Sequence, residues 1–251
     1  MIKIESSNNQ KIKLIKKLEQ KKYRYEYKKF VIFGDDLILE AMKKGIIDFT
    51  LTYNHNKKAD FIIDEKEFRK LDSDNLNVDI LAVCIMPSSK SYQEIQHNNV
   101  LILDEINDPV NSGAIYRNAA GFNFLSVIHS KNSVDIYNSK ALRNSKGAFF
   151  FLDIYENIDL RDILKNLKEK GYLIIGADAH QENIEKLDLI KNGGNKKICL
   201  ILGNESRGLS LISKNFCDVF YKINTVNIES LNVNSAAAII MHDLSRMKND
   251  N

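Results

Sequence analysis

The sequence predicts an α/β fold whose carboxy-terminal part contains a mostly parallel sheet. From residue 100 onward, short apolar runs alternate with amphipathic stretches, which is the pattern of successive strand–helix–strand units. One run, residues 198–202, ends abruptly in Gly203 and polar residues, as a buried parallel strand does when it enters a tight turn. A shorter series of strand-like and helix-like segments precedes residue 86. We therefore expect a small α/β domain followed by a larger one.

The overall composition is ordinary for a globular protein. Of 251 residues, 44% are hydrophobic and 27% are charged, and the net charge of +3 does not by itself indicate a nucleic-acid partner. The cysteines Cys84, Cys199 and Cys217 stand in or beside apolar runs without paired spacing, so we expect reduced thiols that pack in the core. No metal-ligand spacing, signal peptide or membrane-length apolar run is present, so we expect a cytoplasmic protein without a metal or a membrane partner.

The amino-terminal domain, expected over residues 1–95, begins with a basic helix. Ser7 or Asn8 is its candidate N-cap, and apolar residues between positions 12 and 18 give it a buried face. The remaining segments are read as strands at 30–33, 46–53, 61–63 and 80–85 and as helices at 34–44 and 65–71. A polar stretch around Pro87 predicts the boundary, and the second domain is expected over residues 98–251.

The second domain is expected to contain parallel βαβ units. Strands are predicted at 100–103, 124–128, 172–175 and 198–202, and helices at 112–121, 136–144, 160–169 and 233–247. In open parallel sheets, ligands bind outside the carboxyl ends of the strands. Polar residues that follow these strands are therefore candidates for a binding site.

Residues 198–232 are the best candidate for that site. The turn after Gly203 is rich in polar groups, and Ser230 and Asn232 directly precede the strong helix former at 233–247. Their side chains should therefore lie at a helix N-terminus, where backbone donors are available to a polar ligand.

A second polar turn follows the strand at 100–103. It contains Pro109 and leads into a helix that starts near Asn111 and carries Arg117 within two turns. A plain helix cap with a surface arginine is one interpretation. The other is an arginine that holds a phosphate or a ribose at the carboxyl end of a strand.

Basic residues concentrate in two places. Between residues 11 and 27, lysines alternate with aromatics, which suits a phosphate backbone and unstacked bases, although a solvated lysine-rich helix would look the same. The candidate RNA contacts are Lys11, Lys13, Lys16, Lys17, Lys21, Lys22, Tyr23 and Arg24. The helix ending near residue 147 adds Arg143, which is left open between RNA contact and helix-end charge, whereas Lys146 fits the latter.

Three ordered motifs carry a resemblance to a known family. The segments 111–117, 203–210 and 229–233 resemble the motifs of the SpoU (TrmH-like) RNA ribose methyltransferases of the SPOUT superfamily. Residues 143–148 also resemble that family. The first domain looks like the family's amino-terminal substrate-binding domain, which has an L30e-like fold. The segments that carry this likeness are Ser7-Asn8, residues 11–13, Tyr23-Arg24 and Glu40-Ala41. The resemblance covers nearly the whole chain.

The resemblance implies properties that periodicity cannot show. The carboxy-terminal domain would be an α/β-knot, in which the last segment threads through a loop to form a trefoil knot. The cofactor would be S-adenosyl-L-methionine, bound within the knot. The protein would be a homodimer whose interface involves the last helix, residues 233–247.

The resemblance also implies roles for particular residues. The reaction site would be lined by Asn111, Arg117, Glu205, Ser230 and Asn232, with Arg117 as general base or as a clamp on the adjacent phosphate. The cofactor would be contacted by Leu202, Gly203, Asn204, Ile223 and Leu231. The chain departs from the family pattern at residues 223–225, which read Ile-Asn-Thr instead of Ile-Pro-Met, at Asn123, where the family has glycine, and at Phe33, where it has glutamate.

The expected function is transfer of a methyl group from S-adenosylmethionine to a ribose 2′-hydroxyl in ribosomal RNA or tRNA, with ribosomal RNA favoured. The alternative is a non-catalytic RNA-binding or ribosome-assembly factor that keeps the fold. Loss of Asn111, Arg117, Glu205 or Asn232 would favour that alternative, and all four are present. A dehydrogenase would need a glycine-rich dinucleotide fingerprint, which the sequence lacks.

Overall fold

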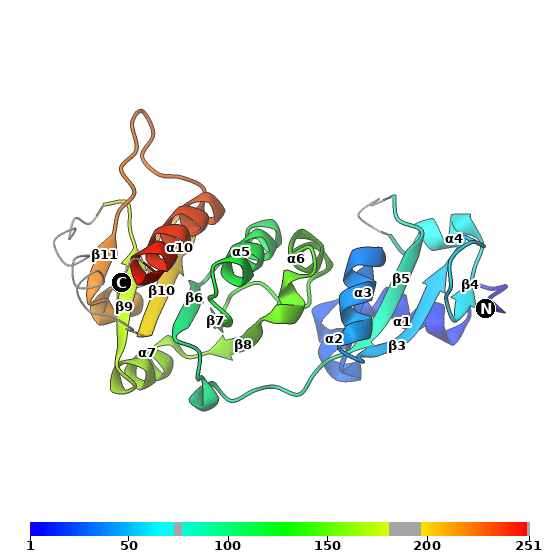
Figure 1. The fold of residues 1–251 in the computed structure, drawn as a ribbon. Helices are drawn as coiled ribbons and strands as arrows, with labels where there is room; N and C mark the ends of the chain where they lie inside the picture. The colour runs from blue at the N-terminus through cyan, green and yellow to red at the C-terminus, as the bar shows by residue number, and fades with distance from the viewer. Residues whose placement is uncertain (73–76, 181–196, 250–251) are drawn as a thin grey trace. The chain divides into compact units, whose positions relative to one another are not determined.

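The protein is described by a computed structural model that covers residues 1–72, 77–180 and 197–249 (Figure 1). Two compact units can be distinguished: one comprises Met1–Ser88 and Tyr137–Phe150, and the other Ser89–Ile136 and Phe151–Asn251. The domain ranges predicted from the sequence, 1–95 and 98–251, stay a prediction. The pattern of strands and helices in the sequence did not predict that residues 137–150 belong to the first unit.

The first unit is built on a mixed five-stranded sheet in the order β1-β4-β3-β5-β2. The strands β2 and β3 pair antiparallel with β5, whereas β4 pairs parallel with β1 and β3. The strands are β1 (Ile2–Lys3), β2 (Lys29–Phe33), β3 (Ile47–Thr52), β4 (Phe61–Ile62) and β5 (Ile80–Ile85). The helices are α1 (Gln10–Leu18), α2 (Lys21–Tyr27), α3 (Asp35–Lys43), α4 (Glu65–Arg69) and α6 (Ser139–Asn144), followed by the short 3-10 turn η2 (Ala148–Phe151).

The basic stretch near the amino terminus forms two helices rather than one. The N-cap of α1 is Asn9, not Ser7 or Asn8, because the Asn9 side chain accepts a hydrogen bond of 2.8 Å from the backbone N–H of Lys11. The apolar face of α1 is buried, as predicted from its spacing. Burial of that face leaves the lysines of α1 on the solvent side.

The second unit contains six parallel strands in the order β11-β9-β10-β6-β7-β8. This confirms the predicted mostly parallel sheet. The strands are β6 (Asn99–Asp104), β7 (Ser126–Ser130), β8 (Asp153–Ile158), β9 (Tyr172–Ala177), β10 (Lys197–Gly203) and β11 (Val219–Tyr221). The helices are η1 (Tyr92–Glu94), α5 (Pro109–Gly121), α7 (Leu160–Glu169), α9 (Leu211–Phe216) and α10 (Val233–Asn249).

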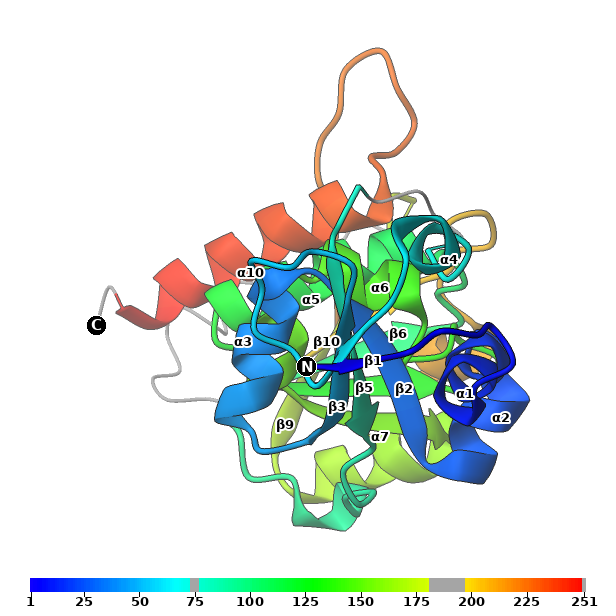
Figure 2. The same ribbon diagram turned by 90° about the vertical axis from the view of Figure 1, so that its right-hand side faces the viewer.

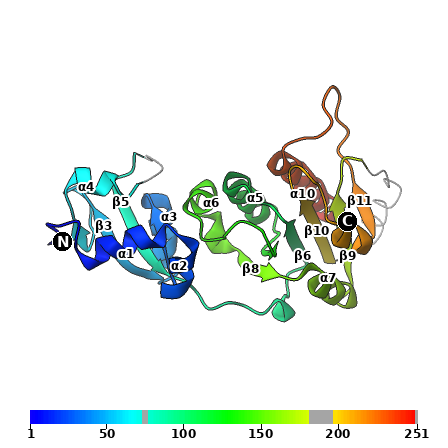
Figure 3. The same ribbon diagram turned by 180° about the vertical axis from the view of Figure 1, so that it is seen from behind.

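The central strand β10 is buried on both faces. Side chains alternate along a strand, so Cys199 and Ile201 pack in the core that α7 completes, while Leu200 and Leu202 point to the opposite face. The helices α5 and α10 pack together, and Figures 1 and 3 show them on one side of the sheet with α7 on the other. This placement brings the start of α10 close to the carboxyl ends of β6 and β10.

Besides the 3-10 turn η1, three elements of the second unit were not predicted. The strand β8, Asp153–Ile158, contains three polar residues, and β11, Val219–Tyr221, spans only three positions. The helix α9 is also short. In addition, β7 begins at Ser126 rather than at residue 124, because Asn123 takes the left-handed conformation with φ 62° and turns the chain first.

The three cysteines are free thiols, as predicted from their spacing. Burial raises the pKa of both Cys84 and Cys217 to about 12, so these thiols stay protonated at neutral pH. None of the described helices is long and apolar enough to cross a membrane. Among the described residues, His, Cys, Asp and Glu form no cluster that could hold a metal ion.

Candidate active site

The strand β10 ends in a tight turn that only glycine permits at its first position. A Cβ atom on Gly203 would lie 2.3 Å from the carbonyl carbon of Gly208 and 2.4 Å from the backbone nitrogen of Leu209. The turn is closed by two backbone hydrogen bonds between Asn204 and Gly208, of 3.0 and 2.9 Å. Gly208 itself has φ +68°, a conformation that glycine adopts most readily.

The carboxyl end of the neighbouring strand β6 holds this turn in place. The buried Asp104, 1% exposed, accepts hydrogen bonds from the Ser210 backbone N–H at 2.8 Å and from the Ser213 hydroxyl at 2.7 Å. The Asn204 side chain donates to the backbone oxygen of Glu105 at 2.8 Å. The turn is therefore attached to the sheet at both of its ends.

The start of α10 forms the opposite wall. The Asn232 side chain accepts a hydrogen bond of 2.9 Å from the backbone N–H of Asn234 and so caps the helix, as its position in the sequence predicted. The side chain of Asn118, on α5, donates to the Asn234 side-chain oxygen at 2.9 Å. This contact joins α5 to the first turn of α10.

A chain of side-chain hydrogen bonds connects the three motifs. The Asn232 amide donates to the Asn111 oxygen at 3.2 Å, and the Asn111 amide donates to the Glu205 carboxylate at 3.0 Å. Asn111 is 8% exposed, and it stands in the first helical turns after the Asp108 cap of α5. The fold thus brings together residues that are 94 and 121 positions apart.

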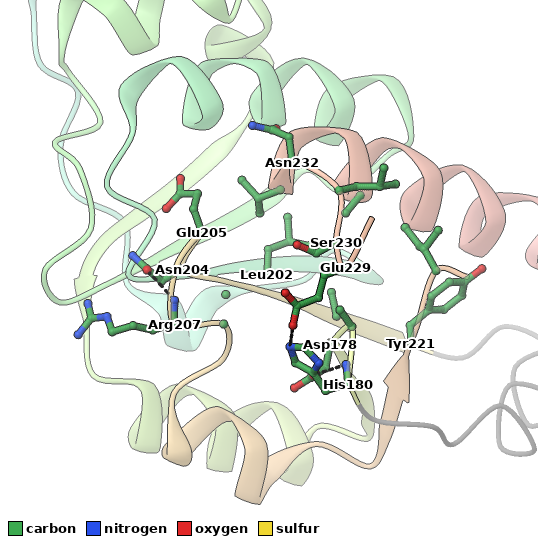
Figure 4. A pocket seen from close by; sticks show the side chains of 18 of the residues that line it. Asp178, His180, Leu202, Asn204, Glu205, Arg207, Tyr221, Glu229, Ser230 and Asn232 are labelled. Carbon is green, nitrogen blue, oxygen red and sulfur yellow. Dashed lines mark hydrogen bonds and ion pairs between the residues drawn. The ribbon is translucent and has the colours of Figure 1, made fainter. Parts of the chain in front are cut away.

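These walls enclose a pocket of about 400 Å³ (Figure 4). All of the residues predicted to contact the cofactor line it: Leu202, Gly203, Asn204, Ile223 and Leu231. Three of the residues predicted for the reaction site also line it: Glu205, Ser230 and Asn232. The structure therefore places residues from both ends of the predicted segment 198–232 around one cavity.

The chemistry of the lining suits a small ligand with apolar and cationic parts. The volume of the pocket lies in the usual range for small-molecule sites. One part of the wall is apolar, from Leu202, Val233, Ala236 and Ile240, and Gly203 contributes only backbone atoms to the lining. The carboxylates of Asp178, Glu205 and Glu229 supply negative charge. These features fit the adenosine and the sulfonium and ammonium groups of S-adenosylmethionine.

Sequence reasoning missed the far side of the pocket. Asp178 follows β9; its side chain is 5% exposed and lies 3.2 Å from the Lys214 ammonium. The His180 backbone N–H donates to Asp178 at 2.8 Å. The Tyr221 hydroxyl donates to Asp243 at 2.6 Å, and burial together with this carboxylate raises the tyrosine pKa. The position of Asp178 directly after a parallel strand was the available signal.

Two predicted arginines do not line this pocket. Arg117 lies on α5 with an exposed side chain, and within the described part of the chain it makes no hydrogen bond or ion pair. Arg143 is half-buried on α6, in the first unit. The roles predicted for both residues stay predictions.

The predicted RNA-binding lysines lie on α1 and α2, and most are exposed. Lys17 donates to the Tyr27 hydroxyl at 3.1 Å and lies 5.5 Å from the ring centroids of both Tyr23 and Tyr27. These two rings are stacked, with their centroids 6.2 Å apart. Lys13, Lys16, Lys21 and Lys22 are exposed, whereas Lys11 packs over the rings of Phe49 and Phe61.

Arg24 has a structural position that its sequence context did not suggest. It is 6% exposed, and its guanidinium donates to the backbone oxygens of Leu18 at 2.8 Å and Glu19 at 2.7 Å. These oxygens belong to the carboxyl end of α1, where carbonyl groups lack partners within the helix. Arg24 therefore ties α2 to α1, and we leave it out of the proposed RNA-binding surface.

Replacement of Arg24 by alanine should destabilise the first unit. Two charge-assisted hydrogen bonds to helix-end carbonyls would be lost, so the free energy of unfolding should fall by about 1.5–3 kcal/mol. Denaturant unfolding measures this change. The control is Lys21→Ala at an exposed position of the same helix, which should stay within about 0.5 kcal/mol of wild type. Equal stability of the two variants would contradict the structural role.

Comparison with known proteins identifies the family. Residues 98–242 match the family model of the SpoU rRNA Methylase family, and residues 9–82 match that of the MRM3-like substrate binding domain. The 23S rRNA (guanosine(2553)-2'-O)-methyltransferase RlmP of Bacillus subtilis is 29% identical over 97% of this chain and 99% of its own length. An uncharacterized tRNA/rRNA methyltransferase of Borreliella burgdorferi is 32% identical over 64% of this chain and 69% of its own.

Solved structures share the fold over nearly the whole chain. The SpoU methyltransferase AviRb from Streptomyces viridochromogenes, in complex with AdoMet, superposes with a TM-score of 0.81 at 20% identity, covering 97% of this chain and 100% of its own. The AdoMet-bound rRNA methyltransferase from Sinorhizobium meliloti gives 0.82 at 19% identity, with 97% of each chain covered. The predicted family and fold class are confirmed. Because residues 98–242, more than half of the chain, match its family model, this chain belongs to the SpoU rRNA methylase family.

Proposed function

We propose that this protein transfers the methyl group of S-adenosylmethionine to a ribose 2′-hydroxyl of ribosomal RNA. The observation that carries the proposal is the hydrogen-bonded chain Asn232–Asn111–Glu205 at the edge of the pocket. It places polar groups from all three motifs beside a cavity of the right size for the cofactor. A non-catalytic RNA-binding factor would not require this row of hydrogen-bonded side chains beside a cavity of cofactor size.

The cofactor would occupy the pocket between the Gly203 turn and the segment 223–233. When bound, it supplies an electrophilic methyl group on a positively charged sulfur. Leu202, Leu231 and Ile240 would cover the adenine, because they form the apolar wall. Gly203, which has no side chain, would contact the ligand through its backbone atoms.

Ribosomal RNA is the substrate that we propose, with 23S rRNA as the first candidate. RlmP of Bacillus subtilis, similar to this chain along almost its whole length, is named for a guanosine of 23S rRNA. The match of residues 9–82 to a substrate-binding domain supports a role of the first unit in holding the RNA. Such a substrate would place the protein in the cytoplasm. tRNA and a purely structural role are the alternatives that the experiment below would detect.

Arg117 would act on the RNA rather than on the cofactor. A guanidinium is always protonated near neutral pH and has no lone pair to accept a proton. It is suited to bind phosphate oxygens in a bidentate manner. We therefore assign Arg117 to the phosphate next to the reacting ribose, an assignment that agrees with its exposed side chain outside the pocket.

We further propose that the protein is a homodimer and that its carboxy-terminal part forms the trefoil knot of its family. The dimer is supported by exposed apolar side chains on α10 and on the loop between β11 and α10. This loop projects from the second unit in Figure 2. Ile239 on α10 is 40% exposed, and Val226 and Ile228 in the loop are exposed as well. Exposed large apolar side chains are frequent at protein–protein interfaces.

The dimer can be tested by sedimentation at micromolar concentration. Wild type should sediment as a dimer of the 28.8 kDa chain. Ile239→Asp should shift the population toward monomer, because a carboxylate would be buried in the interface without a partner. A strictly monomeric wild type would contradict the proposal.

The lysines of α1 and α2 should control RNA affinity without affecting the cofactor. Replacing Lys16, Lys17, Lys21 and Lys22 by alanine should weaken RNA binding and reduce the slope of log K against log salt by up to about 3. Filter binding at several salt concentrations measures this slope. The control replaces Lys44, Lys58, Lys66 and Lys70, exposed lysines of the same unit outside these helices. An equal loss in both variants would show a diffuse electrostatic effect instead.

The proposed function is tested most simply in cells. Ribose methylation is mapped across ribosomal RNA and tRNA from cells with and without this protein. We expect one 2′-O-methyl group of 23S rRNA to disappear when the protein is absent. Disappearance of a tRNA methyl group instead would correct the substrate, and identical maps would refute the methyltransferase role.

A further inference from the structure

The 2′-hydroxyl must lose a proton when it is methylated, and the assignment of Arg117 to phosphate leaves that proton without an acceptor. We propose that the Glu205 carboxylate accepts it. This inference rests on the proposed methyltransferase function and adds a catalytic role to a residue of the same pocket.

The position of Glu205 suits this role. It follows the Gly203 turn directly, lines the pocket, and has an exposed side chain that substrate could reach (Figure 4). One carboxylate oxygen accepts a hydrogen bond of 3.0 Å from the Asn111 side-chain amide. The other oxygen makes no hydrogen bond with any residue of the described chain, so it is available to a substrate hydroxyl.

The hydrogen bond from Asn232 also fixes the orientation of the Asn111 side-chain amide. The Asn111 oxygen is occupied by the Asn232 amide. The Asn111 amide hydrogens must therefore point away from Asn232 and toward Glu205. A donor held in this way orients the carboxylate.

Other acceptors around the pocket are less suitable. Asp178 is almost fully buried and is engaged by the Lys214 ammonium at 3.2 Å and by the His180 backbone N–H. Glu229 lies 3.8 Å from the His180 ring. Neither carboxylate is connected to the Asn111 amide. Glu205 is the carboxylate that the motif residues orient.

The chemistry does not require a strong base. The 2′-oxygen uses a lone pair to form a bond to the methyl carbon, and the carbon–sulfur bond breaks with its electron pair left on sulfur. As the new bond forms, the oxygen becomes positively charged and its proton becomes strongly acidic. A carboxylate can then accept this proton and later release it to water.

Two substitutions test the role. Gln at position 205 keeps an oxygen that accepts from Asn111 but cannot take up a proton, whereas Ala leaves space for a small carboxylic acid. We expect Glu205→Gln to lower the single-turnover rate, measured with saturating S-adenosylmethionine, at least about a hundredfold. Formate should restore part of the rate of Glu205→Ala and should have no effect on wild type.

A binding measurement provides a readout that does not depend on turnover. The RNA fragment that contains the mapped nucleotide is compared with the same fragment carrying a 2′-deoxyribose there. Wild type should prefer the ribose form by about tenfold, because the 2′-hydroxyl of that form donates a hydrogen bond to the Glu205 side chain. Glu205→Ala should lose this preference while it still binds RNA.

The outcomes separate the two proposals. If wild type transfers no methyl group, the proposed function fails. If wild type is active and Glu205→Gln retains a rate within a few-fold of it, Glu205 only orients Asn111 and the inference is overturned. An equal preference for ribose RNA in wild type and Glu205→Ala would overturn it as well, as would the absence of any formate effect on Glu205→Ala.

Discussion

Gly203→Ala is expected to weaken S-adenosylmethionine binding about a hundredfold. The added Cβ atom would lie 2.3–2.6 Å from three backbone atoms of Gly208 and Leu209. Backbone cannot rotate away as a flexible side chain can, so the turn would have to open. Overpacking of this kind costs about 1–3 kcal/mol or more. If it destabilises the turn conformation that binds the cofactor, the upper value corresponds to roughly a hundredfold loss in affinity. Isothermal calorimetry with the cofactor measures the change.

Gly121→Ala is the matched control for this prediction. Gly121 ends α5, and no atom lies within 4 Å of the Cβ position there. Alanine also has the higher helix propensity, so this variant should bind the cofactor like wild type and unfold at an equal or slightly higher temperature. Normal cofactor binding by Gly203→Ala would show that the ligand does not depend on the turn after β10.

Arg117→Ala is expected to lower the single-turnover methylation rate by about a hundredfold to a thousandfold, the usual loss when one group that stabilises or positions reacting charge is removed. Cofactor affinity should stay nearly unchanged, because Arg117 does not line the pocket. A quenched time course with RNA in limiting amount, together with calorimetry, separates the two quantities.

Arg161→Ala is the control for the arginine substitution, since Arg161 is an exposed arginine in the first turn of α7. It should leave the rate unchanged. Arg117→Lys is informative as well: a lysine binds phosphate as a point charge, so a partial rate should survive if Arg117 holds a phosphate. A near-normal rate for Arg117→Ala would remove Arg117 from the mechanism.

Much of the site was predictable because its residues stand at positions with a simple physical meaning. The apolar run that ends in Gly203 is a buried parallel strand, and its carboxyl end does form the pocket. Asn232 precedes a helix former and does cap α10. Both inferences needed only local pattern and the general rule for ligands in parallel sheets.

The remainder depended on contacts between distant segments. Nothing near Asn111 in the sequence indicates that its amide would meet Glu205, 94 positions away. The interpretation of Arg24 as an RNA contact followed from its lysine-rich neighbours, whereas its guanidinium turns inward to the end of α1. Asp178 was overlooked because the residues around it carry no motif. The short strands β8 and β11 offered too few apolar positions to be recognised.

The measurement that tests the central claim most directly is methyl transfer by the purified protein. Ribosomal RNA from cells that lack the protein is incubated with isotope-labelled S-adenosylmethionine, and mass spectrometry locates the label. The account predicts one labelled 2′-O-methyl group per 23S rRNA, formed with an equal amount of S-adenosylhomocysteine and abolished by Asn232→Ala. Label on a base, or no label at all while the protein binds both cofactor and RNA, would contradict it.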